Sequence, residues 1–223
     1  MEDIDAIAVL QDPVRRRLYE YVAAQGREVG RNEAAEAAGV ARTLAAHHLE
    51  KLTEAGLLES GSRRLTGRSG PGAGRPAKVY TRVRTERSVS LPARDYRTAA
   101  ELLAEAAEEA GLDAGLRAGA RRRGEALRGS TAPCRDLEAA VELLASRGYE
   151  PYPEGAAGEA TGVVRMRNCP FHSVAERFPP LVCGMNLALL EGLLGTDGPV
   201  RARMDARPGE CCVVIEDSKN NDH

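Results

Sequence analysis

Residues 42–57 read RTLAAHHLEKLTEAGL, and this stretch decides the fold of the N-terminal part of the chain. Apolar side chains recur in it at steps of three and four residues, which predicts a helix with one buried face. The predicted buried face consists of Leu44, His48 (or Ala45), Leu49, Leu52 and Ala55, and the opposite face of Thr43, Ala46, His47 and Glu50. Gly56 is predicted to end the helix, because the residue after a helix often adopts the left-handed conformation that glycine reaches without penalty.

A shorter helix is expected upstream, over the alanine-rich residues 32–38, followed by a tight turn over residues 38–41. A short helix, a glycine-containing turn and a longer amphipathic helix form the helix-turn-helix pattern, whose second helix enters the major groove of DNA. Support beneath this pair is predicted from a helix that begins at Asp12-Pro13 and ends at Gly26. Aspartate suits the cap of that helix and proline its first position.

The run GVARTLAAHHLEKL (39–52), followed by EAGLL (54–58), resembles the recognition region of ArsR-like winged-helix transcriptional regulators. The resemblance implies a winged helix-turn-helix domain over residues 1–88, with a double-stranded DNA operator as its partner. It places Arg42, Thr43, Ala46 and His47 on the surface that faces the DNA. His48 then packs inward or lies at the edge, and an idle surface position is the alternative for His47.

A strand is expected over residues 57–60 and a second over residues 78–83, and the segment between them is rich in glycine, serine and arginine. Residues 61–87 hold eight basic residues and one acid, a net charge of +7 in a chain whose formal net charge is −2. A basic hairpin after the recognition helix predicts a wing that contacts phosphates or a narrow minor groove. The DNA-contacting residues expected there are Arg63, Arg64, Arg68, Arg75 and Lys78. A solvated loop is the alternative.

At 223 residues the chain has room for two small domains, each with its own core. No basic region followed by an apolar stretch opens the sequence. The longest apolar run, residues 181–194, is interrupted by Asn186 and Glu191 and is too short to span a bilayer. We therefore expect a cytoplasmic protein without membrane contact. Five cysteines in that reducing compartment indicate metal binding, redox chemistry or plain burial rather than a set of disulfides.

Two further parts are predicted downstream. Residues 89–130 are expected to form a helical linker, with helices over about 95–110 and 113–128 whose narrow apolar stripes suit packing across a homodimer. Those stripes contain Ala99, Leu102, Leu103, Ala106, Leu116 and Leu127. A homodimer would also match a palindromic operator.

Residues 131–216 predict a compact α+β domain with a small antiparallel sheet. Its expected elements are a helix over 136–147, strands over 149–152 and 162–167, a sharp turn over 168–172, a helix over 181–194, and strands over 200–205 and 211–216. The polar tail, residues 217–223, is expected to be disordered.

Four cysteines lie in this last part: Cys169 in the predicted turn, Cys183 in a helix, and Cys211 and Cys212 at the start of a strand. No CxxC pair occurs, so the usual spacing of a zinc knuckle is absent. Thiols that arrive from a loop, a helix and a strand can still converge on one metal or cluster. Because a strand alternates its side chains between two faces, only one of Cys211 and Cys212 is expected to face such a site. Burial as small core side chains is the other interpretation.

Three blocks, NCPFH (168–172), LVCGMN (181–186) and GECCV (209–213), together resemble the sensor domain of SufR-type repressors. Those regulators join an ArsR-like winged helix to a C-terminal domain that holds an iron–sulfur cluster. The resemblance implies a 4Fe–4S cluster held by Cys169, Cys183 and Cys211, with zinc as the alternative metal. The pattern leaves the fourth ligand open among Cys212, His172, Cys134 and a group from outside the chain.

The sequence therefore predicts a dimeric α+β transcriptional repressor whose C-terminal cysteines sense redox state or iron. A regulator without an effector, its cysteines merely packed, is one alternative. A thiol enzyme with Cys169 as nucleophile and His172 as base is another. It lacks a third orienting residue in recognisable context and leaves the winged helix unexplained, so we predict that the chain is not an enzyme.

Overall fold

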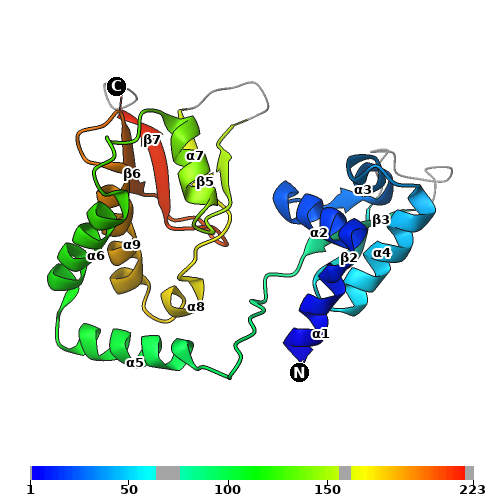
Figure 1. The fold of residues 1–223 in the computed structure, drawn as a ribbon, viewed down its shortest axis with the longest axis horizontal. Coiled ribbons are helices and arrows are strands. Elements are labelled where there is room, and N and C mark those ends of the chain that lie inside the picture. Colours follow the sequence, from blue (N-terminus) through cyan, green and yellow to red (C-terminus); the bar gives the residue numbers. More distant parts are fainter. Residues whose placement is uncertain (1, 64–75, 156–161, 219–223) are drawn as a thin grey trace. The chain divides into compact units, whose positions relative to one another are not determined.

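The computed structural model describes residues 2–63, 76–155 and 162–218, and it divides the chain into two compact units, residues 1–94 and 95–223 (Figure 1). Each unit has its own buried core. Among the described helices, none combines the length and the apolar character needed to cross a membrane.

The first unit combines helices with a three-stranded antiparallel sheet in the order β1-β3-β2. Its elements are α1 (Glu2–Ala8), the 3-10 helix η1 (Val9–Gln11), α2 (Pro13–Gln25), β1 (Val29–Gly30), α3 (Arg31–Ala38), α4 (Arg42–Glu54), β2 (Leu58–Arg63) and β3 (Ala77–Arg82). Strand β2 pairs with β3 from Leu58, opposite Arg82, to Arg63, opposite Ala77. The predicted helix pair and the hairpin that follows it are confirmed.

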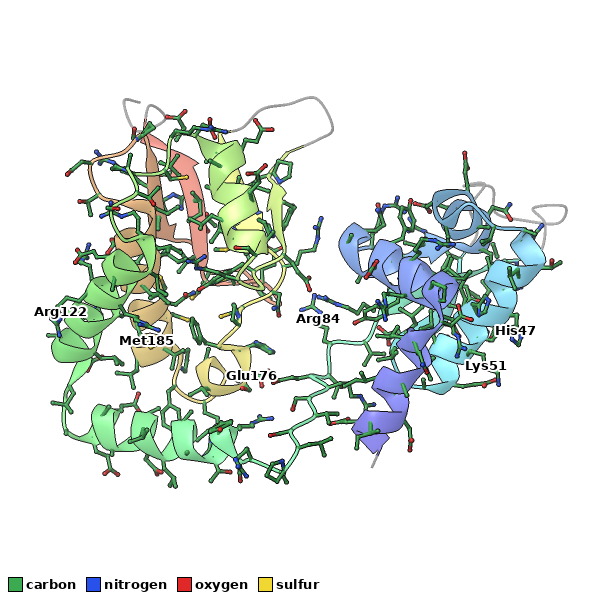
Figure 2. All side chains as sticks on the ribbon, in the orientation of Figure 1. His47, Lys51, Arg84, Arg122, Glu176 and Met185 are labelled. Atoms are coloured by element: carbon green, nitrogen blue, oxygen red, sulfur yellow. The ribbon has the colours of Figure 1, made fainter. Side chains whose placement is uncertain are left out.

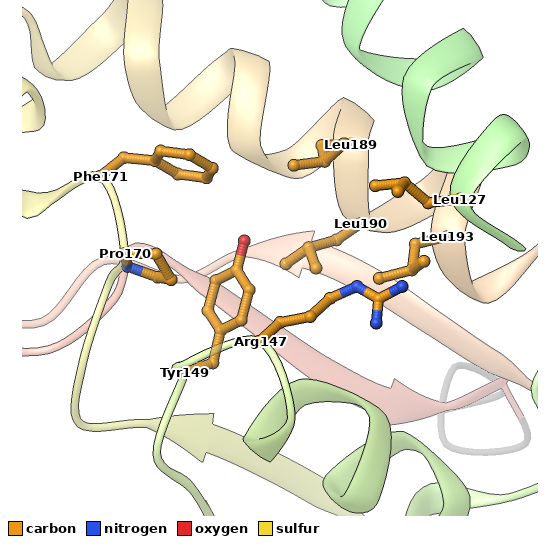
Figure 3. Close-up of a pocket in the computed structure, with 8 residues that line it drawn as sticks. All are labelled: Leu127, Arg147, Tyr149, Pro170, Phe171, Leu189, Leu190 and Leu193. Carbon is orange, nitrogen blue, oxygen red and sulfur yellow. The ribbon is translucent and has the colours of Figure 1, made fainter. Parts of the chain in front are cut away.

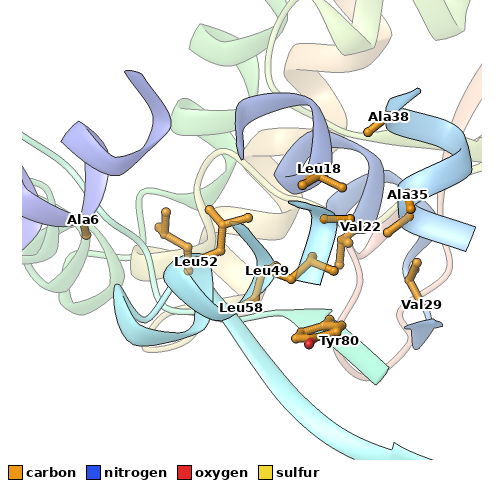
Figure 4. Packing of buried hydrophobic residues seen from close by; sticks show 13 residues of the cluster. Ala6, Leu18, Val22, Val29, Ala35, Ala38, Leu49, Leu52, Leu58 and Tyr80 are labelled. Carbon is orange, nitrogen blue, oxygen red and sulfur yellow. The ribbon is translucent and has the colours of Figure 1, made fainter. Parts of the chain in front are cut away.

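The core of this unit lies where α2, α3 and α4 pack on one another and on β3 (Figure 4). Leu18 of α2, Leu49 and Leu52 of α4, and Tyr80 of β3 are fully buried in it. Full burial of a leucine side chain contributes about 1.5–3 kcal/mol. Helix α4 is therefore anchored by its inner face, which leaves the outer face free to serve as a surface.

Both ends of α2 follow the prediction. The carboxylate of Asp12 accepts hydrogen bonds from the amides of Val14 (2.8 Å) and Arg15 (3.0 Å), which caps the first turn. Gly26 closes the helix with a φ of 61°, a left-handed conformation that costs glycine nothing.

Leu44 was expected on the buried face of α4, and this prediction is wrong. Its side chain is 42% exposed, whereas that of Ala45 is fully buried. The inner face of α4 is built from Ala45, His48, Leu49 and Leu52, so its centre is rotated away from Leu44. The sequence also gave no indication of β1, which spans only two residues and so shows no alternation, or of α1.

The second unit places helices on a four-stranded antiparallel sheet in the order β4-β5-β7-β6. Its elements are α5 (Tyr96–Glu109), α6 (Asp113–Arg128), α7 (Leu137–Ala145), β4 (Pro151–Pro153), β5 (Val163–Met166), α8 (His172–Ala175), α9 (Pro179–Leu194), β6 (Val200–Met204) and β7 (Val213–Asp217). Helices α7 and α9 contact the sheet, and the core between them contains Leu144, Leu190, Val213 and Ile215. The α+β class with small antiparallel sheets is confirmed.

Helices α6 and α9 touch backbone to backbone. A side-chain carbon added to Gly192 would lie 2.2 Å from the carbonyl oxygen of Arg121, and one added to Gly124 would lie 2.2 Å from that of Leu189. Such approaches are far inside van der Waals contact, so only glycine fits at either position. The two helices run beside each other in Figure 1.

Three details of this unit differ from the prediction. The sharp turn expected to extend through His172 gives way to α8, which begins at that residue. Cys211 and Cys212 precede β7, which begins at Val213, so the rule of alternating strand faces does not govern them. Asp217, assigned to the tail, is the last residue of β7. The remaining tail, 219–223, lies outside the described residues.

Helices α5 and α6, expected as part of a separate linker, fall in the same compact unit as the C-terminal elements.

Candidate nucleic-acid interface and thiol cluster

The turn between α3 and α4 fixes how α4 is presented. Gly39 has a φ of 65°, and its amide donates a 3.0 Å hydrogen bond to the carbonyl of Glu36. The amide of Val40 donates to the carbonyl of Ala35, also at 3.0 Å. These two bonds close the end of α3, and α4 begins two residues later, so the angle between the helices is set by a glycine turn.

The outer face of α4 carries most of the residues predicted to read DNA. Arg42, Thr43 and His47 are exposed, and Ala46 is half-buried. Figure 2 shows His47 projecting from α4 away from the body of its unit. Leu44, through its unexpected exposure, joins this face and adds an apolar side chain of the kind that can contact a thymine methyl group.

Glu50 ties α4 to the wing instead of facing solvent. Its carboxylate accepts hydrogen bonds from Arg31 (2.9 Å), Lys78 (2.6 Å) and the hydroxyl of Tyr80 (2.8 Å). The bond from Lys78 is the main cause that lowers the pKa of Glu50, and the bond from Tyr80 adds to it. Lys78, predicted to contact DNA, is thus already paired within the protein.

The base of the wing forms one wall of a groove of about 900 Å³. Its lining includes Arg27, Arg31, Arg42, Arg63 and Lys78 together with Glu28 and Glu33. Arg63 pairs with Glu28 at 3.2 Å. The other predicted wing residues, Arg64, Arg68 and Arg75, lie outside the described residues.

His48 faces the interior, which was one of the two positions expected for it. Its side chain is 8% exposed, and its Nδ1 atom has no hydrogen-bond partner within the described residues. Burial is the main cause that lowers the pKa of His48, against a smaller opposing effect of Asp12. The imidazole is therefore neutral in the folded unit at pH 7.

The thiols of the second unit meet in hydrogen-bonded pairs. Cys169, which precedes α8, pairs with Cys211, and Cys183 of α9 pairs with Cys212. Cys211 and Cys212 also hydrogen-bond each other, so the two pairs are joined. Because both precede the regular strand, the alternation of strand faces does not decide which of these neighbours faces a site.

A buried amide adjoins this group. The hydroxyl of Tyr149 donates a 2.6 Å hydrogen bond to Oδ1 of Asn186, and Nδ2 of Asn186 lies 3.4 Å from Sγ of Cys211. All three side chains are buried. Because Tyr149 supplies a donor, the amide oxygen must face the tyrosine and the amide nitrogen must face the sulfur. Asn186 is therefore held as a donor to Cys211.

Burial and hydrogen bonding keep Cys169, Cys183 and Cys211 protonated. The bond with Cys211 is the main cause that raises the pKa of Cys169. For Cys211, the bond from Cys169 lowers the pKa, but the bond with Cys212 and burial outweigh it and bring the pKa to about 11. Burial raises the pKa of Cys183 as well. Ionisation of the group therefore calls for a cation among the sulfurs.

The two other candidates for a fourth ligand, Cys134 and His172, have partners outside the group of four thiols. The Cys134 thiol donates to the carbonyl of Asp136 at 3.4 Å, at the start of α7. His172 faces Glu176 at 3.2 Å, and both side chains are more than half exposed. Within residues 2–63, 76–155 and 162–218, no three histidine, cysteine, aspartate or glutamate side chains are arranged to hold a metal ion.

A small, mostly apolar cavity of about 90 Å³ lies between α9 and the turn that follows Cys169 (Figure 3). Pro170 and Phe171, which follow Cys169 directly, line it together with Tyr149, and leucines of α9 close it. The cavity is large enough for a few water-sized molecules and offers them almost no polar partners.

An arginine network holds the loop that carries Cys211. Arg165 of β5 is 1% exposed, and its guanidinium pairs with Asp205 (2.6 Å), Glu154 (3.2 Å) and, more distantly, Glu210 (3.9 Å). Loss of these carboxylates would strongly destabilise the unit, because it would leave the buried guanidinium charge unpaired. The two ends of the loop before β7 are thereby fixed to the sheet.

A family model described as a helix-turn-helix domain matches residues 10–61. This segment is a helix-turn-helix domain. No curated protein and no solved structure matched the chain. The matched range runs from η1 through α4 into β2, so the helix-turn-helix domain contains the outer face of α4 described above. The match suggests a DNA-binding regulator.

Three residues near the two sites escaped the sequence-based reasoning. Glu50 was expected on the open face of the helix-turn-helix domain, and nothing in its own sequence context shows the partners that arrive from β3. In the sequence, Asn186 stands out only as an interruption of the apolar run over residues 181–194. A single polar residue in an otherwise apolar helix indicates a buried hydrogen bond, so that signal was present. Tyr149 gave none.

Proposed function

We propose that the protein is a homodimeric transcriptional repressor that binds an operator through α4 and the wing, and that its C-terminal thiols hold an iron–sulfur cluster. The observation that carries the proposal is the meeting of four thiols from three separate segments in the unit that follows a helix-turn-helix domain.

For DNA binding, the proposal rests on the outer face of α4. Arg42 presents a guanidinium of the kind that binds guanine edges or phosphates, and His47 presents a ring nitrogen. Thr43 is small enough to let the helix approach the groove closely. The Glu50 network supports this role, because it fixes α4 to β3 and so sets the spacing between the helix and the wing.

For the cluster, the chemistry of the donors fits: the four thiols lie in two linked pairs, and they would have to converge further, because no three of the described side chains are arranged to hold a metal ion. Thiolates are the standard ligands of iron–sulfur clusters, and a cluster when bound supplies one-electron redox chemistry together with sensitivity to oxidants. Cys169, Cys183 and Cys211 would hold it, and the placement of Cys212 in the same hydrogen-bonded group favours it over His172 and Cys134 as the fourth ligand. The amide of Asn186, aimed at Cys211, suits a sulfur that carries negative charge.

The proposal also gives α9 the task of relaying the state of the site. This helix carries Cys183 and Asn186 near its start and Gly192 near its end, where it touches α6 backbone to backbone. Two helices in such contact move together, because there is no side chain between them to yield.

The experiment is purification without oxygen, followed by a visible absorption spectrum and assays of iron, sulfide and zinc. We expect coloured protein with iron and sulfide, and we expect replacement of Cys169, Cys183 or Cys211 by serine to abolish the colour. The matched control is Cys134→Ser, whose thiol belongs to a different part of the unit and which should keep the colour. Colourless protein with one zinc per chain would overturn the cluster and indicate a zinc site. Colourless, metal-free protein would indicate a regulator whose cysteines are merely packed.

A further inference from the structure

Helix α5 has an apolar face that nothing covers within the described part of the second unit. Tyr96, Ala99, Leu103, Ala106 and Ala110 follow one another at steps of three, four, three and four residues, the spacing of a coiled-coil seam. All five are exposed, Tyr96 at 74% and Leu103 at 73%. Leu102, beside this seam, is 60% exposed.

The other side of α5 is already in use. Ala104 and Ala107 pack against the small cluster around Leu181, and Glu101 pairs with Arg177. The helix is thus held on its unit by one face and turns its larger apolar side chains outward. A helix that exposes leucines while it packs alanines against its own unit is built for a second contact.

The neighbouring helix α6 offers a surface of complementary shape. It exposes Ala114, Gly115, Ala118 and Ala126, and a side-chain carbon added at Gly115 would meet nothing within 4 Å. Small residues let another helix approach closely, so larger side chains can pack between them. In Figure 1, α5 and α6 form the outer side of this unit, next to α8 and α9.

The charges of the two helices are opposite. Helix α5 holds four glutamates and one arginine, net −3, and α6 holds five arginines, one aspartate and one glutamate, net +3. Within the described residues, no ion pair neutralises Glu105 or Glu109 of α5, or Arg122 or Arg123 of α6. Two copies of α5 seam to seam would bring like charges together, whereas α5 against α6 brings opposite charges together.

We propose that the partner of this surface is a second copy of the chain, with α5 of each protomer packed against α6 of the other. A two-fold axis then repeats the same contact twice, as closed dimers require. The inference rests on the proposed homodimer and assigns its interface. Each helix is only about 21–24 Å long, so the free dimer is weak, and two operator half-sites bound at once strengthen it.

Sedimentation velocity of the full chain over a range of concentrations tests the interface. Wild-type protein should show a reversible monomer–dimer equilibrium, and Leu103→Glu should raise the dimer dissociation constant at least about tenfold, because it buries a charge at the centre of the seam. Glu109→Arg and Arg122→Glu should each weaken the dimer, and the double variant should recover most of the loss. Glu108→Arg, on the opposite side of α5, is the matched control and should change little.

The outcomes separate the two claims. A wild-type protein that stays monomeric at every concentration and on operator DNA overturns the proposed homodimer itself. A wild-type dimer that Leu103→Glu leaves intact overturns the interface only. If Glu109→Arg weakens the dimer and Arg122→Glu does not, α5 pairs with something other than α6, and the proposed pairing is wrong.

Discussion

Replacement of Gly192 by alanine should destabilise the second unit, although alanine is the better helix former. The added methyl carbon would sit 2.2 Å from the carbonyl oxygen of Arg121, and ordinary contact begins at 3.4 Å, so α6 must retreat by about 1.2 Å. Neither atom belongs to a flexible side chain that could swing aside. The retreat also pulls on the pair between Arg121 and Glu191 and on the 3.2 Å bond from Arg128 to the carbonyl of Gly192.

The expected magnitude follows from two opposing effects. Overpacking of a tight contact costs about 1–3 kcal/mol and occasionally more, and the gain in helix propensity from glycine to alanine returns about 1 kcal/mol. Because the added methyl group meets backbone atoms, we place the overpacking at the upper end of its range and expect a net loss of about 2 kcal/mol. In a unit of this size that corresponds to a fall in Tm of roughly 5–10 °C.

Gly184, eight residues earlier in α9, provides the matched control. A side-chain carbon there would meet only the side chain of Arg117, at 3.5 Å, which is ordinary contact. Gly184→Ala should therefore stabilise the metal-free protein by up to about 1 kcal/mol through helix propensity alone. Urea or thermal unfolding followed by circular dichroism measures both variants. The reasoning is refuted if the two substitutions shift stability in the same direction, or if Gly192→Ala stabilises the protein.

Three further outcomes are expected. His48→Leu should stabilise the first unit more at pH 5.5 than at pH 8. Burial lowers the pKa of His48, so its imidazole binds fewer protons in the folded protein than in the unfolded chain, and wild-type stability decreases as the pH falls below about 6.5. Equal gains in urea unfolding at both pH values would contradict this. Glu50→Gln should lower stability at pH 7 by about 0.5–1 kcal/mol, a modest loss because the pair with Lys78 is partly exposed. Because the folded pKa of Glu50 is lowered, this contribution is fully present above the unfolded pKa of about 4.3 and is lost as the pH falls through the lowered folded pKa. A loss of stability that persists at low pH would count against an ionic cause. Asn186→Leu should lower the free energy of unfolding in urea by about 1–3 kcal/mol, because Tyr149 and Cys211 lose their buried hydrogen-bond partner. With the cluster bound, it should also lower the reduction potential by removing the donor to Cys211. An unchanged potential would show that the amide does not act on the sulfur.

The helix-turn-helix domain could be predicted from the sequence because its determinants are local. The three- and four-residue steps of Leu49 and Leu52, the cap at Asp12 and the glycines at 39 and 56 all act within a few residues of their own positions. Leu44 failed for a physical reason. Periodicity fixes which residues share a face of the helix, but not which of them lies at the centre of the packed side. The contacts of α4 with α2 and α3 bury Ala45 and leave Leu44 exposed.

The thiol site could be predicted only in outline. Cys169, Cys183 and Cys211 remain the ligands that the sequence predicts, and their origin in different elements could be predicted as well. The placement of Cys212 depends on where β7 starts, and an element boundary two residues later removes the alternation argument. The roles of Tyr149 and Asn186 depend on contacts between residues 37 positions apart, which no local pattern encodes.

The same limit applies to the helices of the second unit. The glycines at 124 and 192 each look like weak points of a helix when read alone, because glycine is a poor helix former. Only the crossing of α6 and α9 shows that each glycine is required by the other helix. In α5, the exposed seam and the alanine face are both visible in the sequence, but which one faces the unit is decided by tertiary packing.

The central claim is that the state of the C-terminal thiols governs operator binding. The direct test is the affinity of the full chain for its operator, measured without oxygen at one fixed salt concentration, for the cluster-loaded and the metal-free protein. The account predicts dissociation constants that differ by roughly 5- to 150-fold, the usual range of coupling between two sites. It also predicts that Cys211→Ser gives the metal-free value under both conditions. Equal affinities for the loaded and the metal-free protein would contradict the account and leave a DNA-binding regulator whose cysteines are merely packed.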